Sequence, residues 1–142
     1  MIEIFDFEKD NGIASFYDSH ITLNKPLLRH CDDTYRVRVG NDKDAKKLYL
    51  FLLNKDRALS GEFNESTLIK PSFSKTYFRL CSKQLMDYIF SDYGFKVEKN
   101  VPLKFKAYFD DVKKAIVIDM EEMLAWWILK IIWYGFGLEY LW

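Results

Sequence analysis

Cysteine is scarce in this sequence, because Cys31 and Cys81 are the only two among 142 residues. Two thiols are too few for a disulfide framework or a metal site built from cysteines, and they are typical of a reduced, intracellular protein, which we place in the cytoplasm. Net charge is also missing, since 21 basic residues balance 21 acidic ones. No field of the whole protein therefore favours nucleic acid, membranes or acidic substrates, and any charged site must be local.

Signatures of catalysis and secretion are missing as well. The sequence has no glycine-rich phosphate loop and no nucleophile elbow. Its clustered potential metal ligands are the consecutive residues His30, Cys31, Asp32 and Asp33, a run typical of a turn rather than of an ion site. The first residues are acidic and lack a basic region followed by an apolar one, which argues against secretion. We therefore expect no enzymatic activity, no cofactor and no metal ion.

The composition favours a packed protein. Hydrophobic residues make up 49% of the chain and aromatic residues 18%, which is enough for a core and argues against disorder. The length predicts one domain over residues 1–142.

An internal repeat organises this domain. Residues 21–28 resemble residues 78–85, and residues 35–52 resemble residues 103–118 in outline. Each unit, approximately residues 14–54 and 72–119, is predicted to form a strand, a helix and a β-hairpin. The fold class is therefore α+β, with both hairpins in one mixed sheet or in two facing sheets.

The first arm of each hairpin alternates between apolar and basic residues. Val37 and Val39 alternate with Arg36 and Arg38, which predicts a strand with one buried face and an outward basic face. The second unit has the same alternation, with Phe105 and Ala107 inward and Lys104 and Lys106 outward. The returning arms, residues 48–53 and 115–118, are continuous apolar runs and are predicted to be central strands.

The helix of the second unit is predicted to begin after Ser82 and to end at Gly94, with Ser72 or Ser74 as an alternative start. Residues 55–71 between the units read as a connector with a helical turn.

The end of the chain is rich in apolar and aromatic residues. Residues 119–142 predict a hydrophobic helix that begins near Asp119, buries Trp126, Trp127 or both, and packs against the sheet or a partner. A membrane span is disfavoured because Lys130 lies in the middle of the segment, whereas contact with a membrane surface stays an alternative. A homodimer is one arrangement in which the segment would be covered. The candidate interface residues are Trp126, Trp133, Tyr134 and Trp142.

Basic residues exceed acidic ones by ten to five between Lys70 and Lys114. If the units are related by a pseudo-twofold axis, the outward basic residues of the two hairpins can form one basic surface for a phosphate backbone. The alternative is that they are ordinary solvated positions. The candidate nucleic-acid-binding residues are Arg36, Arg38, Lys75, Arg79, Lys104 and Lys106.

The order of motifs resembles a known group of DNA-binding domains. An Ile-Thr-Leu strand at residues 21–23 is followed by a short helix, a Tyr-x-Val-x-Val arm, an acidic turn and a Leu-x-Leu arm. This order resembles the swapped-hairpin domains of the AbrB and MazE type over residues 16–53 and, more loosely, 73–119. Two units in one chain are similar in layout to the MraZ regulators. The resemblance implies that Arg36, Arg38, Lys104 and Lys106 face DNA.

Two functional classes follow. The first is a small, non-enzymatic DNA-binding regulator that uses the basic faces of both hairpins. The second is a protein-binding inhibitor, such as an immunity, antitoxin-like or anti-defence protein, that uses the aromatic C-terminal segment.

Overall fold

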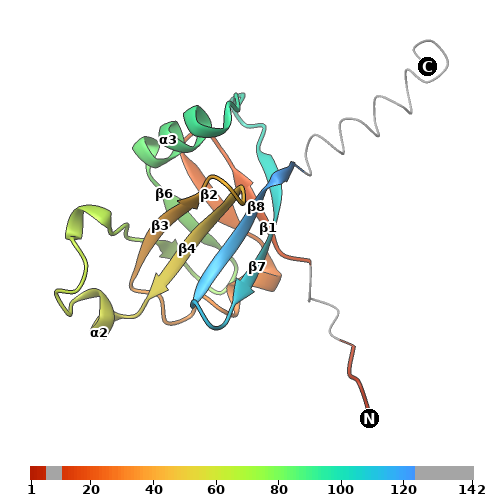
Figure 1. Cartoon of the computed structure of the whole chain (residues 1–142), viewed down its shortest axis with the longest axis vertical. Coiled ribbons are helices and arrows are strands. Elements are labelled where there is room, and N and C mark those ends of the chain that lie inside the picture. Colours follow the sequence, from red (N-terminus) through yellow and green to blue (C-terminus); the bar gives the residue numbers. More distant parts are fainter. Residues whose placement is uncertain (6–10, 124–142) are drawn as a thin grey trace.

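The computed structural model describes residues 1–5 and 11–123. Within them, eight strands form one antiparallel sheet that curls into a half-barrel, in the order β3-β4-β8-β7-β1-β2-β6-β5 (Figure 1). The strands are β1 (Ile13–Phe16), β2 (His20–Leu23), β3 (Arg36–Asp42), β4 (Lys47–Leu53), β5 (Ser72–Phe73), β6 (Phe78–Cys81), β7 (Leu103–Asp110) and β8 (Ala115–Met123). The helices are α1 (Lys25–Leu28), α2 (Lys55–Ala58), the 3-10 turn η1 (Glu65–Thr67) and α3 (Lys83–Tyr93).

The predicted α+β layout is wrong. Strands account for 38% of the described residues and helices for 19%, and every strand pair in the sheet is antiparallel rather than mixed. The difference arises because α1 and α2 are single turns of four residues, while each unit contains one more strand than predicted. These extra strands, β1 and β5, pair with β2 and β6.

The two hairpins lie where the alternation predicts them. β3 pairs with β4 from Arg36–Leu53 to Asp42–Lys47, and β7 pairs with β8 across the second turn. β4 and β8 also pair with each other, so both returning arms are central strands, as predicted.

The strands of the two units interleave in the sheet. β4 lies beside β8, β2 beside β6, and β7 of the second unit pairs with β1 of the first. Tyr49 pairs with Val117 between the hairpins, and the shift from 49 to 117 is the same as the shift from Arg36 to Lys104. The Tyr49–Val117 pair therefore lies on a pseudo-twofold axis that relates the two hairpins from their turns to Val39 and Ala107, beyond which a register shift in β7–β8 pairs Phe105 with Met123.

The two edges of the curled sheet meet at one bridge. The Val37 N–H donates to the Ile69 carbonyl at 2.9 Å, and the Ile69 N–H donates to the Val37 carbonyl at 2.8 Å. Ile69 lies just before β5, so this bridge joins the β3 edge to the chain that leads into the β5 edge.

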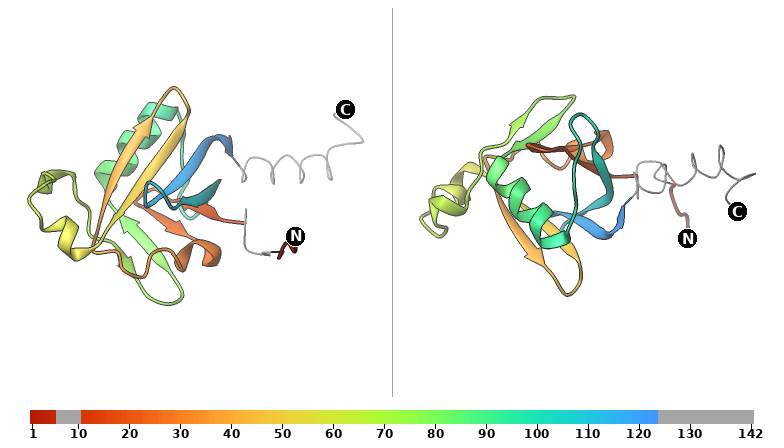
Figure 2. Two further views of the ribbon diagram at one scale, coloured as in Figure 1. Left: turned by 60° about the horizontal axis from the view of Figure 1, so that its bottom comes forward. Right: turned by 90° about the horizontal axis from the view of Figure 1, so that it is seen from above.

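The inner face of the curled sheet forms the hydrophobic core. Alternate residues of the strands point inward, and α3 lies at one end of the curled sheet, where it contributes Met86 and Ile89 (Figures 1 and 2). The Ser82 hydroxyl accepts a hydrogen bond from the Leu85 N–H, and Gly94 ends the helix in the left-handed conformation. These are the predicted ends of the helix. The alternative start at Ser72 or Ser74 is wrong, because Ser72 is in β5.

The predicted helix from Asp119 is wrong where the structure describes the chain. β8 continues to Met123, with Ile118 and Met120 buried and Asp119 and Glu121 directed outward. The carboxylates therefore alternate along a strand and do not mark a helix N-terminus. Residues 124–142, which include the candidate residues Trp126, Trp127, Trp133, Tyr134 and Trp142, lie outside the described residues. In the part of the chain that is described, no helix has the length and apolar character to cross a membrane.

Candidate nucleic-acid interface

The outer face of β3, β4, β8 and β7, here called the hairpin face, carries the candidate cations. Its central row runs across the four strands through Gly40, Tyr49, Val117 and Tyr108. Arg38 lies toward one end of this face, where its neighbours across the sheet are Phe51 and then Ala115.

The basic residues of the two hairpins occupy opposite corners of the hairpin face. Arg36 and Arg38 are half-buried on β3, and Lys104 is half-buried and Lys106 exposed on β7. β3 and β7 lie three strand spacings apart in the sheet and run antiparallel. The two basic pairs therefore share one face but do not touch each other.

Lys75 and Arg79 lie on the other half of the sheet. Lys75 is exposed in the turn between β5 and β6, and Arg79 is exposed on β6 opposite Thr22 of β2. The Arg79 guanidinium lies 5.6 Å from the centroid of the Tyr77 ring. Along the sheet β6 lies six strands away from β3, but the Val37–Ile69 bridge brings the chain that leads into β5 back to the β3 edge.

Several cations of the hairpin face lie over aromatic rings. Arg36 lies 4.2 Å over the Tyr35 ring, Lys113 4.9 Å over Tyr49, and Lys47 6.0 Å over Tyr108. None of Arg36, Arg38, Lys104 and Lys106 forms an ion pair with a described residue. Their charge is therefore not neutralised by a nearby carboxylate within the described chain.

The aspartates at the hairpin turns form hydrogen bonds with the backbone of the turns. The Asp42 carboxylate accepts a hydrogen bond from the Ala45 N–H, and the Asp110 carboxylate accepts hydrogen bonds from the Val112 and Lys113 N–H groups. These carboxylates stabilise the turn backbone, as is common for aspartate in turns.

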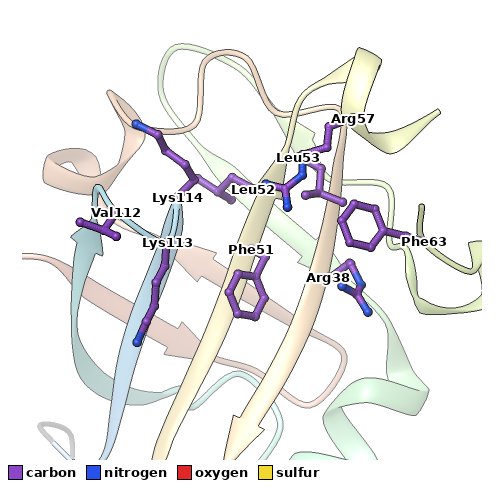
Figure 3. A pocket seen from close by; sticks show the side chains of 9 residues that line it. All are labelled: Arg38, Phe51, Leu52, Leu53, Arg57, Phe63, Val112, Lys113 and Lys114. Atoms are coloured by element: carbon purple, nitrogen blue, oxygen red, sulfur yellow. The ribbon is translucent and has the colours of Figure 1, made fainter. Parts of the chain in front are cut away.

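A pocket adjoins Arg38 where the connector between the units folds against β3 and β4. It has a volume of about 310 Å³ (Figure 3). The connector supplies Arg57, which follows Lys55 and Asp56 in α2, and Phe63. The lining residues are Arg38, Phe51, Leu52, Leu53, Arg57, Phe63, Val112, Lys113 and Lys114.

Two guanidinium groups of this pocket lie against one ring. The Cζ atom of Arg38 is 4.4 Å from the Phe63 centroid, and that of Arg57 is 5.3 Å from it. The Arg38 Nε is buried and has no hydrogen-bond partner among the described residues. Sequence reasoning predicted Arg38 as a site residue but missed Arg57 and Phe63, because a connector carries no periodic pattern that fixes which face it covers.

A second, smaller cavity of about 260 Å³ lies near His30. The His30 ring stacks on Phe109 at 4.2 Å between centroids. Burial, followed by the nearby Arg29 charge, lowers the pKa of His30 below its ordinary value of 6.5. Cys31 is buried while Asp32 and Asp33 are exposed, so the side chains of the His30 to Asp33 run diverge. Among the described residues no three His, Cys, Asp or Glu side chains are grouped to hold a metal ion.

No family model, curated protein or solved structure matches the chain.

Proposed function

We propose that this protein is a small, non-catalytic DNA-binding protein whose hairpin face contacts the phosphate backbone of a duplex. The observation that carries the proposal is that the two pseudo-twofold-related hairpins place Arg36 and Arg38 on β3 and, beyond a bulge, Lys104 and Lys106 on β7 at opposite corners of one face, with none of the four paired with a described carboxylate. The two strands of a DNA duplex are themselves related by a twofold axis, and symmetric binding sites mirror the symmetry of the protein that reads them.

The two basic pairs are far enough apart to contact separate phosphate groups. Neighbouring strands lie about 4.8 Å apart, so β3 and β7 are separated by roughly 14 Å across the sheet. Arg38 lies in the same row as Asp110, four residues along β7 from Lys106, which adds about 13 Å along the strands. The two corners are therefore roughly 19 Å apart, so a phosphate contact at one corner does not compete with a contact at the other.

The interleaved strands also support one shared binding surface, because they hold both hairpins in a single sheet. The hairpin β3–β4 pairs with β8 of the other unit, while β7 pairs with β1 of the first. Each hairpin thus lies against strands of the other unit.

The test compares two variants that remove the same amount of charge. Replacing Arg38 and Lys106 by Gln is expected to weaken duplex binding and to lower the slope of log affinity against log salt by about two, or roughly one for each lost phosphate contact. Replacing Lys96 and Lys99, which are exposed in the loop after α3, by Gln is the matched control and is expected to leave the slope unchanged. Fluorescence anisotropy with a labelled duplex over a salt series measures both.

The outcome for the unmodified protein decides between the two functional classes. If it fails to bind duplex DNA at about 50 mM salt, where non-specific binders are retained, the DNA-binding proposal is wrong. The protein-binding class then remains, and a pull-down with the full chain is the next experiment.

A further inference from the structure

The pocket beside Arg38 breaks the pseudo-twofold symmetry of the hairpin face. Arg38 and Lys106 are equivalent by the shift that relates the two hairpins, and among the described residues a connector covers Arg38 but not Lys106. Arg57 and Phe63 of that connector turn the first corner into a cavity. The corner at Lys106 is an exposed part of a strand.

From this asymmetric pocket we infer a second binding site, for one nucleotide: a phosphate monoester attached to a planar base. The positive charges of the pocket point to an anionic ligand. Two guanidinium groups, from Arg38 and Arg57, lie against the same Phe63 ring, and none of the nine lining residues is acidic. Two like charges at one ring repel each other, and a phosphate between them would relieve that repulsion while accepting their hydrogen bonds.

Both arginines have hydrogen-bond donors that a ligand can use. The Arg38 Nε is buried without a described acceptor, and leaving a buried donor unsatisfied destabilises a protein. Arg57 is exposed and contacts Glu62 only at 3.9 Å, a weak ion pair at a solvent-exposed position. A phosphate oxygen is a stronger acceptor for both guanidinium groups than these surroundings provide.

The ammonium groups of the two lining lysines do not lie between the arginines. The Lys113 Nζ lies over the Tyr49 ring and the Lys114 Nζ pairs with Asp111 at 2.8 Å. Figure 3 shows both lysine side chains running away from Phe63 and Arg38. The space between the arginines is thus left to a ligand, and the two arginines are its recognition groups.

The size and lining of the pocket favour a base beside the phosphate. About 310 Å³ is at the lower end of the range of small-molecule sites. Phe51 and Phe63 contribute two aromatic rings to the pocket. Every nucleobase can stack on an aromatic side chain, whichever base it is. An inorganic phosphate alone would leave both rings uncovered.

Isothermal titration of the full chain with 5′-AMP, adenosine and inorganic phosphate tests the site. 5′-AMP is expected to bind at least about tenfold more tightly than either fragment, because both the phosphate and the base contribute. Arg57→Gln is expected to weaken binding of 5′-AMP about tenfold, as for the loss of one charge-assisted hydrogen bond. Phe63→Leu is expected to weaken 5′-AMP more than it weakens phosphate.

Lys55→Gln is the matched control, because it removes one charge from the same helix α2 without lining the pocket. It is expected to bind 5′-AMP like the unmodified chain. Glu62→Gln removes the carboxylate beside Arg57 and is expected to strengthen binding. Arg57 is exposed, so its replacement leaves the fold intact, and circular dichroism of each variant checks this.

The inference is overturned if 5′-AMP binds no more tightly than inorganic phosphate, or if Arg57→Gln and Lys55→Gln behave alike. A short oligonucleotide with and without a 5′-phosphate distinguishes the source of the ligand. Preferential binding of the phosphorylated strand assigns the site to a strand end, and binding of 5′-AMP alone assigns it to a free nucleotide. Failure of this test leaves the DNA-binding proposal standing, because the replaced residues Arg57 and Phe63 belong to the connector, and Arg38, which both proposals share, is left in place.

Discussion

Lys46 and Lys114 occupy equivalent positions in the two hairpin turns, and the backbone carbonyl of each accepts a hydrogen bond from the other hairpin. Their φ angles are +55° and +52°. The Met120 N–H donates to the Lys46 carbonyl at 2.9 Å, and the Leu52 N–H donates to the Lys114 carbonyl at 3.0 Å. Exchanging the two hairpins exchanges these two bonds, so the pseudo-twofold relation extends from the strands to the backbone of the turns.

Both lysines are expected to be suboptimal for stability. A side chain in the left-handed region costs about 1–2 kcal/mol, whereas glycine adopts it without that cost but loses about 0.5–1 kcal/mol of conformational entropy. Lys46→Gly and Lys114→Gly are therefore each expected to raise the free energy of unfolding by roughly 0.5–1 kcal/mol. Chemical denaturation measures the change. Ala45→Gly, in the same turn without a positive φ, is the control and is expected to lower stability.

Gly12 is required by the close approach of β7. Its carbonyl accepts a hydrogen bond from the Ala107 N–H at 3.0 Å, and a Cβ atom at this position would collide with the Ala107 carbonyl oxygen and lie 2.7 Å from Leu27 Cδ2. We expect Gly12→Ala to destabilise the protein by about 2–3 kcal/mol, as overpacking does in cores. Gly61→Ala meets no atom within 4 Å and is expected to cost only about 1 kcal/mol for its positive φ. Equal effects in thermal denaturation would contradict this view of Gly12.

The two cysteines are expected to differ in reactivity. Cys31 is buried and donates to the Leu27 carbonyl at 3.5 Å, and burial followed by the Asp32 charge raises the pKa of its thiol to about 12. Cys81 is exposed on β6. Iodoacetamide at about pH 8 should therefore label Cys81 and leave Cys31 intact until the protein unfolds, because the thiolate is the reactive form. Mass spectrometry locates the label, and Cys81→Ser should abolish labelling of the native protein.

Stability is expected to fall on mild acidification because of two histidines. Burial is the main cause that lowers the pKa values of His20 and His30 below 6.5 in the folded protein, with Arg79 and Arg29 respectively as the next cause. As the pH falls below about 6.5, the unfolded chain binds protons first, so the free energy of unfolding decreases until both folded histidines are protonated.

Denaturation at about pH 7.5 and pH 5.5 is expected to show this loss, and His20→Gln with His30→Gln is expected to reduce it. NMR titration provides the direct check. A measured pKa of His30 at or above 6.5 would contradict the proposed cause.

Local patterns predicted much of the chain correctly, whereas its long-range arrangement could not be derived from them. The alternation around Val37 and Phe105 located β3 and β7, and Ser82 with Gly94 located α3. β5 was missed because it has only two residues, both exposed, and no alternation to detect. Asp119 was assigned to a helix because a carboxylate before an apolar run fits a helix N-terminus as well as it fits an outward strand position.

In the candidate site, too, local features could be predicted from the sequence and long-range contacts could not. The outward cations of β3 and β7 follow from a period of two residues, but the opposite-corner arrangement depends on which strands are neighbours in the sheet. The pocket required the connector to fold over Arg38. Arg38 and the connector residues are distant in the sequence, and a single sequence does not show which distant residues are in contact.

Because strands of the two units alternate in the sheet, the sheet can be completed only after the second unit has been synthesised. When β4 leaves the ribosome, the first unit has no partner for the outer edge of β4 or of β1, because those partners are β8 and β7. The first half must keep open strand edges in solution until the second half emerges. Two nascent chains held close together can satisfy the same edges by exchanging halves, so the topology that joins the repeats within one chain also provides a route to an intertwined dimer.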